Sequence, residues 1–172
     1  MNLKALSEPL GADQIEWRVQ SINKGGYATL IPYKDARADM QRLDAVVGPL
    51  NWKREHSRDN HNCTVSIYNP DTNQWVGKED VGTESNAEAQ KGLASDSFKR
   101  ACFNWGIGRE LYDYPLIQVK LKDDEYEGTK ATWRFNLKTW DWYVEFDEDG
   151  NVSFLAGRDS NNNIRVKYGE RR

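Results

Sequence analysis

Residues 79–106 read EDVGTESNAEAQKGLASDSFKRACFNWG, and this stretch predicts the end of a strand, a short polar turn and one long amphipathic helix. Asn86 suits the N-cap position, because its side chain can accept a hydrogen bond from a free backbone N–H of the first turn. Gly106 suits the end of the helix. Small and apolar residues recur at helical spacing and predict one buried face: Leu93, Ala94, Ser97, Phe98, Ala101, Cys102 and Trp105.

Two adjacent cations fall on the opposite half of this helix. Lys99 and Arg100 follow Asp96 by about one turn, and a single carboxylate cannot neutralise both. A positive spot therefore remains, and a phosphate group is the ligand that fits it. The alternative interpretation is an ordinary solvated helix face, because charge runs on helix surfaces often have no further role.

The chain as a whole is acidic and rich in aromatic residues. It has 172 residues, of which 38% are hydrophobic and 12% aromatic, and its formal net charge is −3. This length predicts one domain, or a domain with a small appendage, that is large enough to bury a core. The acidic balance argues against general nucleic-acid binding, so contact with a polyanion requires cations that are gathered locally.

The sequence also indicates the compartment. The N-terminus, MNLKALSEPLG, lacks the apolar run of a signal peptide, and no segment reaches transmembrane length. Cys63 and Cys102 lie in apolar patterns and are expected to be buried free thiols. We therefore expect a cytoplasmic protein without membrane contact.

Hydrophobic periodicity predicts an α+β fold, an antiparallel sheet or meander packed on the long helix, with a β-rich C-terminal annex. A short helix is expected at 3–10 and a second one at 35–48, capped by Asp35 and ended by Gly48. Alternation and turn residues predict strands at 15–22, 27–33, 50–57, 63–68 and 75–82, and then at 116–123, 131–137, 140–146, 152–156 and 164–169. We divide the chain into a core at 1–114 and an extension at 115–172.

Residues that would support catalysis are sparse. His56, His61 and Cys63 fit no standard zinc spacing and lack a fourth ligand. The acidic runs at 123–125 and 147–149 lie in predicted turns, and neither a nucleophile elbow nor a Walker loop is present. We therefore expect neither an enzyme nor a cofactor, although a metal-dependent nuclease with carboxylate ligands stays open as an alternative.

Cations displayed on predicted surfaces are the more informative feature. Arg18 falls on the polar face of a strand and Arg37 on the outer surface of the helix at 35–48, in addition to Lys99 and Arg100. Basic grooves with aromatic neighbours typically hold single-stranded nucleic acid. The candidate nucleic-acid-binding residues are Arg18, Lys24, Tyr33, Arg37, Lys91, Lys99, Arg100 and Phe103, with Trp52 as a further aromatic neighbour.

The order of motifs resembles the Rad-fifty-two-type single-strand annealing proteins. The resemblance covers roughly residues 8–114, through GADQIEWRVQ at 11–20, YKDARADMQRLDAVVG at 33–48, NW at 51–52, EDVG at 79–82 and ASDSFKRACFNWG at 94–106. EDVG followed by a helix with the pattern S-D-x-x-K-R-A is the most specific part. The short length resembles a phage or prophage member of the family, and a phage-encoded chain is expected in the bacterial host cytoplasm.

This resemblance implies an assembly and a site. Family members join side by side into rings or arcs, and a positive groove runs around the assembly. The inner DNA-binding cations of the family match Arg18, Lys99 and Arg100. The family's eukaryotic members carry a lysine of a second, outer DNA site in a longer segment before the helix, and the shorter TESNAEAQ at 83–90 offers no counterpart.

The expected function is ATP-independent annealing of complementary single-stranded DNA in recombination and repair. Phosphates would be held while the bases face outward, and weak contacts repeated along an oligomer would add up. Expected partners are single-stranded DNA and further copies of the chain, with a single-strand binding protein or a phage exonuclease as additional candidates. An RNA-binding or chaperone-like module is the alternative.

Overall fold

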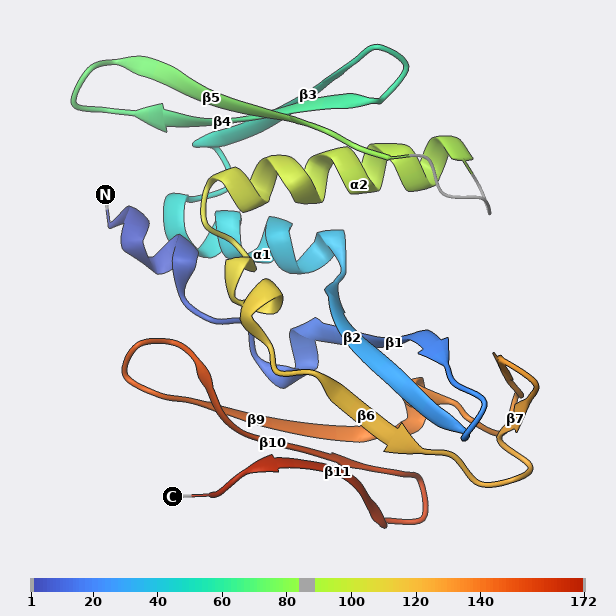
Figure 1. Cartoon of the computed structure of the whole chain (residues 1–172). Coiled ribbons are helices and arrows are strands. Elements are labelled where there is room, and N and C mark those ends of the chain that lie inside the picture. The colour runs from blue at the N-terminus through green and yellow to red at the C-terminus, as the bar shows by residue number, and fades with distance from the viewer. Residues whose placement is uncertain (1, 84–88, 172) are drawn as a thin grey trace. The chain divides into compact units, whose positions relative to one another are not determined.

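A computed structural model describes residues 2–83 and 89–171 of the chain. The chain divides into two compact units (Figure 1). The first unit comprises Met1–Glu8 and Lys34–Arg109, and the second comprises Pro9–Tyr33 and Glu110–Arg172. Each unit is built from two segments that are distant in the sequence.

The first unit is a sheet backed by two helices. The short 3-10 helix η1 (Leu3–Ser7) precedes α1 (Ala36–Val47), the strands β3 (Trp52–Ser57), β4 (Asn62–Asn69) and β5 (Gln74–Val81), and the helix α2 (Ala89–Asn104). The strands form an antiparallel sheet with β4 in the centre. Helix α2 runs along one face of this sheet, and α1 packs on α2 (Figure 1).

The core of the first unit lies between the sheet and α2. Strand β4 contributes Cys63, Val65 and Ile67, whose alternate positions place them on one face of the sheet, and all three are buried. On α2, the buried side chains are Leu93, Ser97, Phe98, Ala101 and Cys102, whereas Ala94 and Trp105 are half-buried. Both cysteines are free thiols, and burial raises the pKa of Cys63 to about 11.

Gly82 allows the end of β5 to approach α2 closely. A Cβ atom at this position would lie 2.7 Å from the backbone nitrogen of Ser97 and 2.9 Å from the carbonyl oxygen of Leu93. Only glycine fits against the helix backbone at this distance. The glycine of the EDVG motif is thus explained by packing.

A buried ion pair connects α1 to the turn that follows α2. The Lys34 ammonium lies 2.5 Å from Asp39 Oδ1 and donates a hydrogen bond to the carbonyl oxygen of Ile107 at 2.7 Å. Burial raises the pKa of Asp39 to about 6, although the charge of Lys34 opposes this shift. The second carboxylate oxygen of Asp39 is buried without a hydrogen-bond partner within the described residues.

The second unit consists mainly of short strands. It contains η2 (Ala12–Gln14), β1 (Ile15–Ile22), β2 (Tyr27–Lys34, the last residue of which belongs to the first unit), η3 (Arg109–Asp113, which begins at the unit boundary), β6 (Ile117–Lys120), β7 (Tyr126–Glu127), β8 (Lys130–Ala131), η4 (Leu137–Thr139), β9 (Asp141–Phe146), β10 (Val152–Arg158) and β11 (Ile164–Gly169). One sheet has the order β1-β2-β6, another has the order β9-β10-β11, and β7 and β8 form a hairpin. Strand β6 pairs with β2 from Tyr27–Lys120 to Leu30–Ile117, which joins the N-terminal hairpin to the C-terminal half of the chain.

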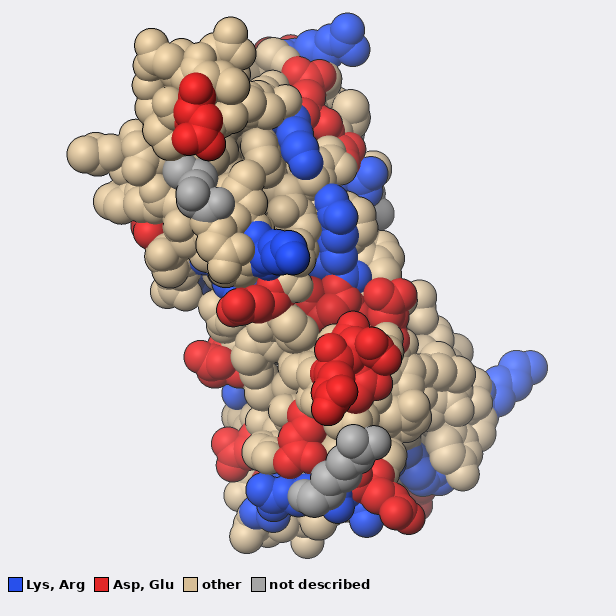
Figure 2. Space-filling view, turned by 90° about the vertical axis from the view of Figure 1, so that its left-hand side faces the viewer, with Lys and Arg blue, Asp and Glu red and all other residues tan. Residues whose placement is uncertain are grey.

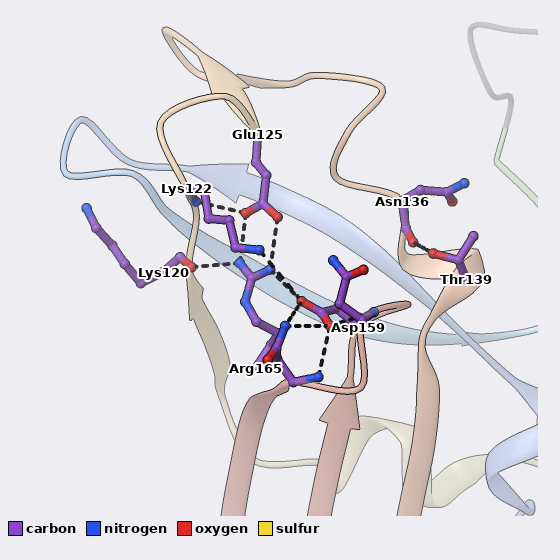
Figure 3. A network of polar contacts seen from close by, with 9 residues as sticks. Lys120, Lys122, Glu125, Asn136, Thr139, Asp159 and Arg165 are labelled. Carbon is purple, nitrogen blue, oxygen red and sulfur yellow. Dashed lines mark hydrogen bonds and ion pairs between the residues drawn. The ribbon is translucent and has the colours of Figure 1, made fainter.

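A half-buried arginine, Arg165, ties the loop after β6 to the hairpin of β10 and β11. Arg165 donates hydrogen bonds to both carboxylate oxygens of Glu125, at 2.9 and 2.7 Å, and to the carbonyl oxygen of Lys120 at 3.1 Å (Figure 3). Burial alone would raise the pKa of Glu125. The hydrogen bonds from Arg165 and from the backbone N–H of Lys122, together with the charges of these two residues, outweigh burial and hold the pKa below its usual value. Asp159 also accepts a bond from Arg165 at 3.4 Å.

The sequence predicted most of these elements. Helix α1 begins after the expected cap, since the Asp35 carboxylate accepts a hydrogen bond from the backbone N–H of Arg37, and it ends at Gly48. The N-cap expected at Asn86 lies outside the described residues. The short helix expected over residues 3 to 10 is present as η1, a helix of the 3-10 type that ends at Ser7. Among the described residues, no helix has the length and apolar character needed to cross a membrane.

The strand predicted at 131–137 was wrong. Only Lys130–Ala131 pair with β7, and the residues after them form a turn and the 3-10 helix η4. The backbone N–H of Phe135 bonds to the carbonyl of Thr132 at 3.1 Å, which closes that turn. The division into a core at 1–114 and an extension at 115–172 follows motifs and stays a prediction, whereas the compact units group residues 9–33 with 110–172.

Candidate nucleic-acid interface

Lys99 and Arg100 lie on α2 away from its buried face. Lys99 is half-buried and Arg100 is exposed. The Asp96 carboxylate accepts hydrogen bonds from the backbone N–H and the hydroxyl of Thr83, at 2.9 and 3.3 Å. Asp96 is therefore engaged by the segment that follows β5, and no ion pair joins it to either cation within the described residues.

Arg100 pairs with a carboxylate that sequence reasoning did not associate with it. Its Nε lies 3.3 Å from Oδ1 of Asp80 on β5, and the Arg100 side chain is 46% exposed. Such a pair at the surface is weak, because water screens both charges. Arg100 can therefore exchange Asp80 for a phosphate at small cost.

Two further cations lie at the C-terminal end of α2. Lys78 donates to the carbonyl oxygen of Asn104 at 2.8 Å and lies over the Trp105 ring at 4.4 Å. Arg109 donates to the carbonyl oxygens of Phe103 and Asn104, at 2.8 and 2.9 Å. Cations are stabilised at this end of a helix by its free carbonyl groups. Sequence reasoning missed both cations. Lys78 could have been found because it lies two residues before Asp80 on the same strand and so shares its face, and Arg109 because it follows the end of the helix.

Arg37 lies near the start of α1 and forms local contacts. Its guanidinium lies 3.2 Å from the Asp35 carboxylate, and 80% of its side chain is exposed. The hydrogen bond from the Arg37 side chain is the main reason why the pKa of Asp35 lies below its usual value, and the charge of Lys99 acts in the same direction. Both cations therefore favour the charged form of Asp35, the N-cap residue of α1.

The remaining candidates of the first unit are only partly described. Phe103 is half-buried, and the Arg109 guanidinium lies 5.6 Å from the centre of its ring. Lys91 belongs to α2, but its side chain lies outside the described residues. Figure 2 shows Lys and Arg side chains close together on the part of the molecule that holds α1, α2 and the sheet of β3–β5, with acidic side chains among them.

The second unit holds Arg18, Tyr33 and Lys24. The Arg18 guanidinium lies 4.6 Å from the centre of the Tyr33 ring and 3.3 Å from the Glu16 carboxylate, and its side chain is 54% exposed. Lys24 is exposed in the turn between β1 and β2. Arg18 and Tyr33 are thus brought together as a cation–aromatic pair, which is a common element of single-strand binding. A groove shared with Lys99 and Arg100 stays a prediction, because these residues lie in the other unit.

A pocket of about 690 Å³ lies beside Arg18 within the second unit. Its lining includes Arg18, Lys138 and the indoles of Trp17, Trp140 and Trp142. Trp142 stacks on Trp17 at 4.4 Å between ring centres and on Trp140 at 5.7 Å. Asp13, Glu16 and Asp141 also line the pocket, so its charge is mixed.

No cluster of three or more His, Cys, Asp or Glu side chains that could hold a metal ion occurs in residues 2–83 and 89–171. His56, considered above as a ligand, lies near Ser97, and burial lowers its pKa. His61 bonds through Nδ1 to the carbonyl oxygen of Arg58 at 2.7 Å. The contact of His56 thus joins β3 to α2, whereas the contact of His61 lies in the turn between β3 and β4.

The fold and the surface together are typical of a protein that contacts nucleic acid through its backbone. A helix-backed sheet presents ammonium and guanidinium groups, held by carbonyl oxygens, aromatic rings and weak ion pairs, and this arrangement suits contact with a phosphate backbone. The chain belongs to the Rad52/22 family of double-strand break repair proteins, whose family model matches residues 2–130. The family expected from the sequence motifs is confirmed.

Two relatives of the chain are both single-stranded DNA-binding proteins called DdrA. The chain is 36% identical over 130 residues to the single-stranded DNA-binding protein DdrA of Deinococcus radiodurans. The aligned region covers 74% of this chain and 62% of that protein. It is 33% identical over 127 residues to the DdrA protein of Deinococcus deserti, which covers 72% of this chain and 63% of that protein. The chain thus spans less than two thirds of the length of these relatives. No solved structure is significantly similar to the chain.

Proposed function

We propose that the chain binds single-stranded DNA through its phosphate backbone and anneals complementary strands without ATP. The observation that carries this proposal is the position of Lys99 and Arg100 on α2 away from its buried face, in a chain of the Rad52/22 family. The relatives named as single-stranded DNA-binding proteins support the choice of ligand. Annealing is downhill, so the protein has only to gather the strands and leave their base edges free.

The cations divide this work by position. Lys99 and Arg100 bind phosphates from α2, and Lys78 and Arg109 extend the positive surface at the end of the same helix. Arg18, supported by the Tyr33 ring, is a phosphate-binding cation of the second unit. These groups contact the backbone, so binding is independent of sequence.

Oligomerisation is part of the proposal because few cations are available in each subunit. The net charge of −3 makes an isolated chain a poor polyanion binder. Side-by-side copies in a ring or arc repeat the same cations along one strand, and the weak contacts then add up. A basic track on an acidic particle results.

The first test removes both helix cations. Lys99→Ala with Arg100→Ala should weaken binding of a single-stranded oligonucleotide by about tenfold or more at physiological salt, because two phosphate contacts are lost in every subunit. Lys4→Ala with Lys53→Ala removes the same charge from exposed positions of the first unit and is the matched control. Equal loss in both variants, or none in the first, would reject the site, provided that circular dichroism shows intact folds.

The same preparation separates the alternative functions. An RNA strand of identical sequence should bind less tightly than DNA if the groove is adapted to DNA, and tighter RNA binding would favour the RNA-binding alternative. Added magnesium should leave a labelled single strand intact. Shortening of that strand would instead indicate a metal-dependent nuclease.

A further inference from the structure

The segment at 128–140, GTKATWRFNLKTW, is basic in an acidic chain. It contains Lys130, Arg134 and Lys138 and no Asp or Glu, whereas the whole chain has a net charge of −3. Nearly all of this segment lies beyond residue 130, where the family match ends. Its role is therefore not explained by the residues that define the family.

An ordered turn presents Trp133 and Arg134 at the centre of this segment. The turn is closed by the bond from Phe135 N–H to the Thr132 carbonyl at 3.1 Å, and the Thr132 hydroxyl donates to the carbonyl oxygen of Asp124 at 2.7 Å. Phe135 is buried and packs edge-on against Trp140, with the ring centres 5.5 Å apart. Both flanks of the turn are thus anchored, which fixes the two residues between them.

Trp133 is 82% exposed at the tip of this turn. Burying a tryptophan is strongly favourable, and Trp17 and Trp140 of the same unit are buried. An indole that an anchored turn holds in water is a large apolar surface available for a ligand. The Arg134 guanidinium lies 5.0 Å from the centre of its ring and 3.3 Å from the Asp124 carboxylate, so a cation accompanies the indole.

We propose that Trp133 stacks on an unpaired base of single-stranded DNA while Lys130, Arg134 and Lys138 contact the adjacent phosphates. This inference rests on the proposed function and adds a base contact to the backbone contacts described above. Charge selects the occupant, because an aromatic ring among cations and without carboxylates in the same segment matches a strand of bases and phosphates. The surface ion pair between Arg134 and Asp124 is weak and can be exchanged for a phosphate, whereas a neutral protein face would offer the cations of this segment no anion.

Stacking on Trp133 is compatible with annealing. Every base has a π-face, so the contact tolerates any sequence. It uses the face of the base and leaves the Watson–Crick edge free for a complementary strand. A strand held in this way is presented rather than covered.

The test compares Trp133→Ala with Trp133→Phe on two ligands, an oligonucleotide with bases and an abasic strand of the same length. Trp133→Ala should weaken binding of the normal strand by about fivefold or more, which is the lower end of the effect of one base–aromatic stack. Trp133→Phe should retain most of the affinity. On the abasic strand, Trp133→Ala and the unmodified protein should bind equally. Leu116→Ala, at a position that is 74% exposed in the same unit, is the control for loss of an apolar surface group.

Three outcomes would overturn the inference. Unchanged affinity of Trp133→Ala for the normal strand excludes stacking, and an equal loss on the abasic strand shows that bases are not the ligand. A changed oligomeric state of Trp133→Ala in sedimentation assigns the indole to an interface between proteins. If the unmodified protein binds neither strand, the proposed function itself fails, and this result is distinct from the other three.

Discussion

At the scale of single residues, the buried pair of Lys34 and Asp39 is the most consequential polar contact of the first unit. Lys34 is 8% exposed and Asp39 is fully buried. Removing one partner of such a pair leaves an uncompensated buried charge, whereas replacing both with apolar residues is often tolerated. The pair therefore invites a double substitution in which the fold is kept and the charges are removed.

The pKa of Asp39 predicts how stability depends on pH. Burial raises this pKa from 3.8 to about 6, so the folded protein binds the proton more tightly than the unfolded chain. The contribution of Asp39 to the free energy of unfolding therefore increases as pH falls from 7 toward 5. This contribution amounts to about 1 kcal/mol between the two pH values. Denaturant unfolding should show the stability of the natural chain rising by this amount relative to Lys34→Met with Asp39→Leu. A constant difference between the two proteins across this range would contradict the assignment.

Single residues also show what could not be predicted from the sequence. Lys34 bonds to Ile107, and Arg165 bonds to Glu125, across 73 and 40 positions of the chain. Periodicity and turn chemistry are local signals and carry no information on such partners. The exposure of Arg100 followed from helical spacing, but its pairing with Asp80 required the sheet to be placed on the helix.

At the scale of elements, local signals succeeded where the neighbouring structure agreed with them. Asp35 and Gly48 bound α1 as expected because capping involves only adjacent backbone groups. The strand expected at 131–137 failed because alternation of Trp133, Phe135 and Leu137 resembles a strand, whereas Thr132 and Phe135 close a turn. An alternating pattern of five or six residues cannot distinguish these outcomes.

The contact between β5 and α2 makes Gly82 a sensitive position. Gly82→Ala places a methyl group 2.7 Å from a backbone atom of α2, so the helix or the strand must shift, and stability should fall by about 1–3 kcal/mol. The matched control is Gly77→Ala within β5, where the new atom would meet side-chain atoms of Thr64 and Ser66 and no backbone atom of α2. Thermal unfolding of the two variants measures the difference. A larger loss for Gly77→Ala would show that the approach of β5 to α2 does not determine stability here.

At the scale of the whole molecule, the two units place the candidate residues in separate groups. Lys99, Arg100 and Arg37 belong to the first unit, and Arg18, Tyr33 and Lys24 belong to the second. The sequence motifs identified both groups, and the family match spans both. The motifs predict the chemistry of the site, but they did not reveal that β2 pairs with β6 or that residues 9–33 share a unit with the C-terminal strands.

The proposed assembly predicts how affinity depends on strand length. If side-by-side subunits share one strand, the affinity for oligonucleotides should rise steeply with length and continue to rise beyond the span of one subunit, because each added subunit contributes further phosphate contacts. Fluorescence anisotropy with a series of oligonucleotides, combined with mass measurement of the complexes, tests this expectation. The slope of affinity against salt should also steepen with length, since more counterions are released. A chain that stays monomeric on long strands, with affinity that stops rising at the shortest bound length, would contradict the shared track and leave the acidic net charge without compensation.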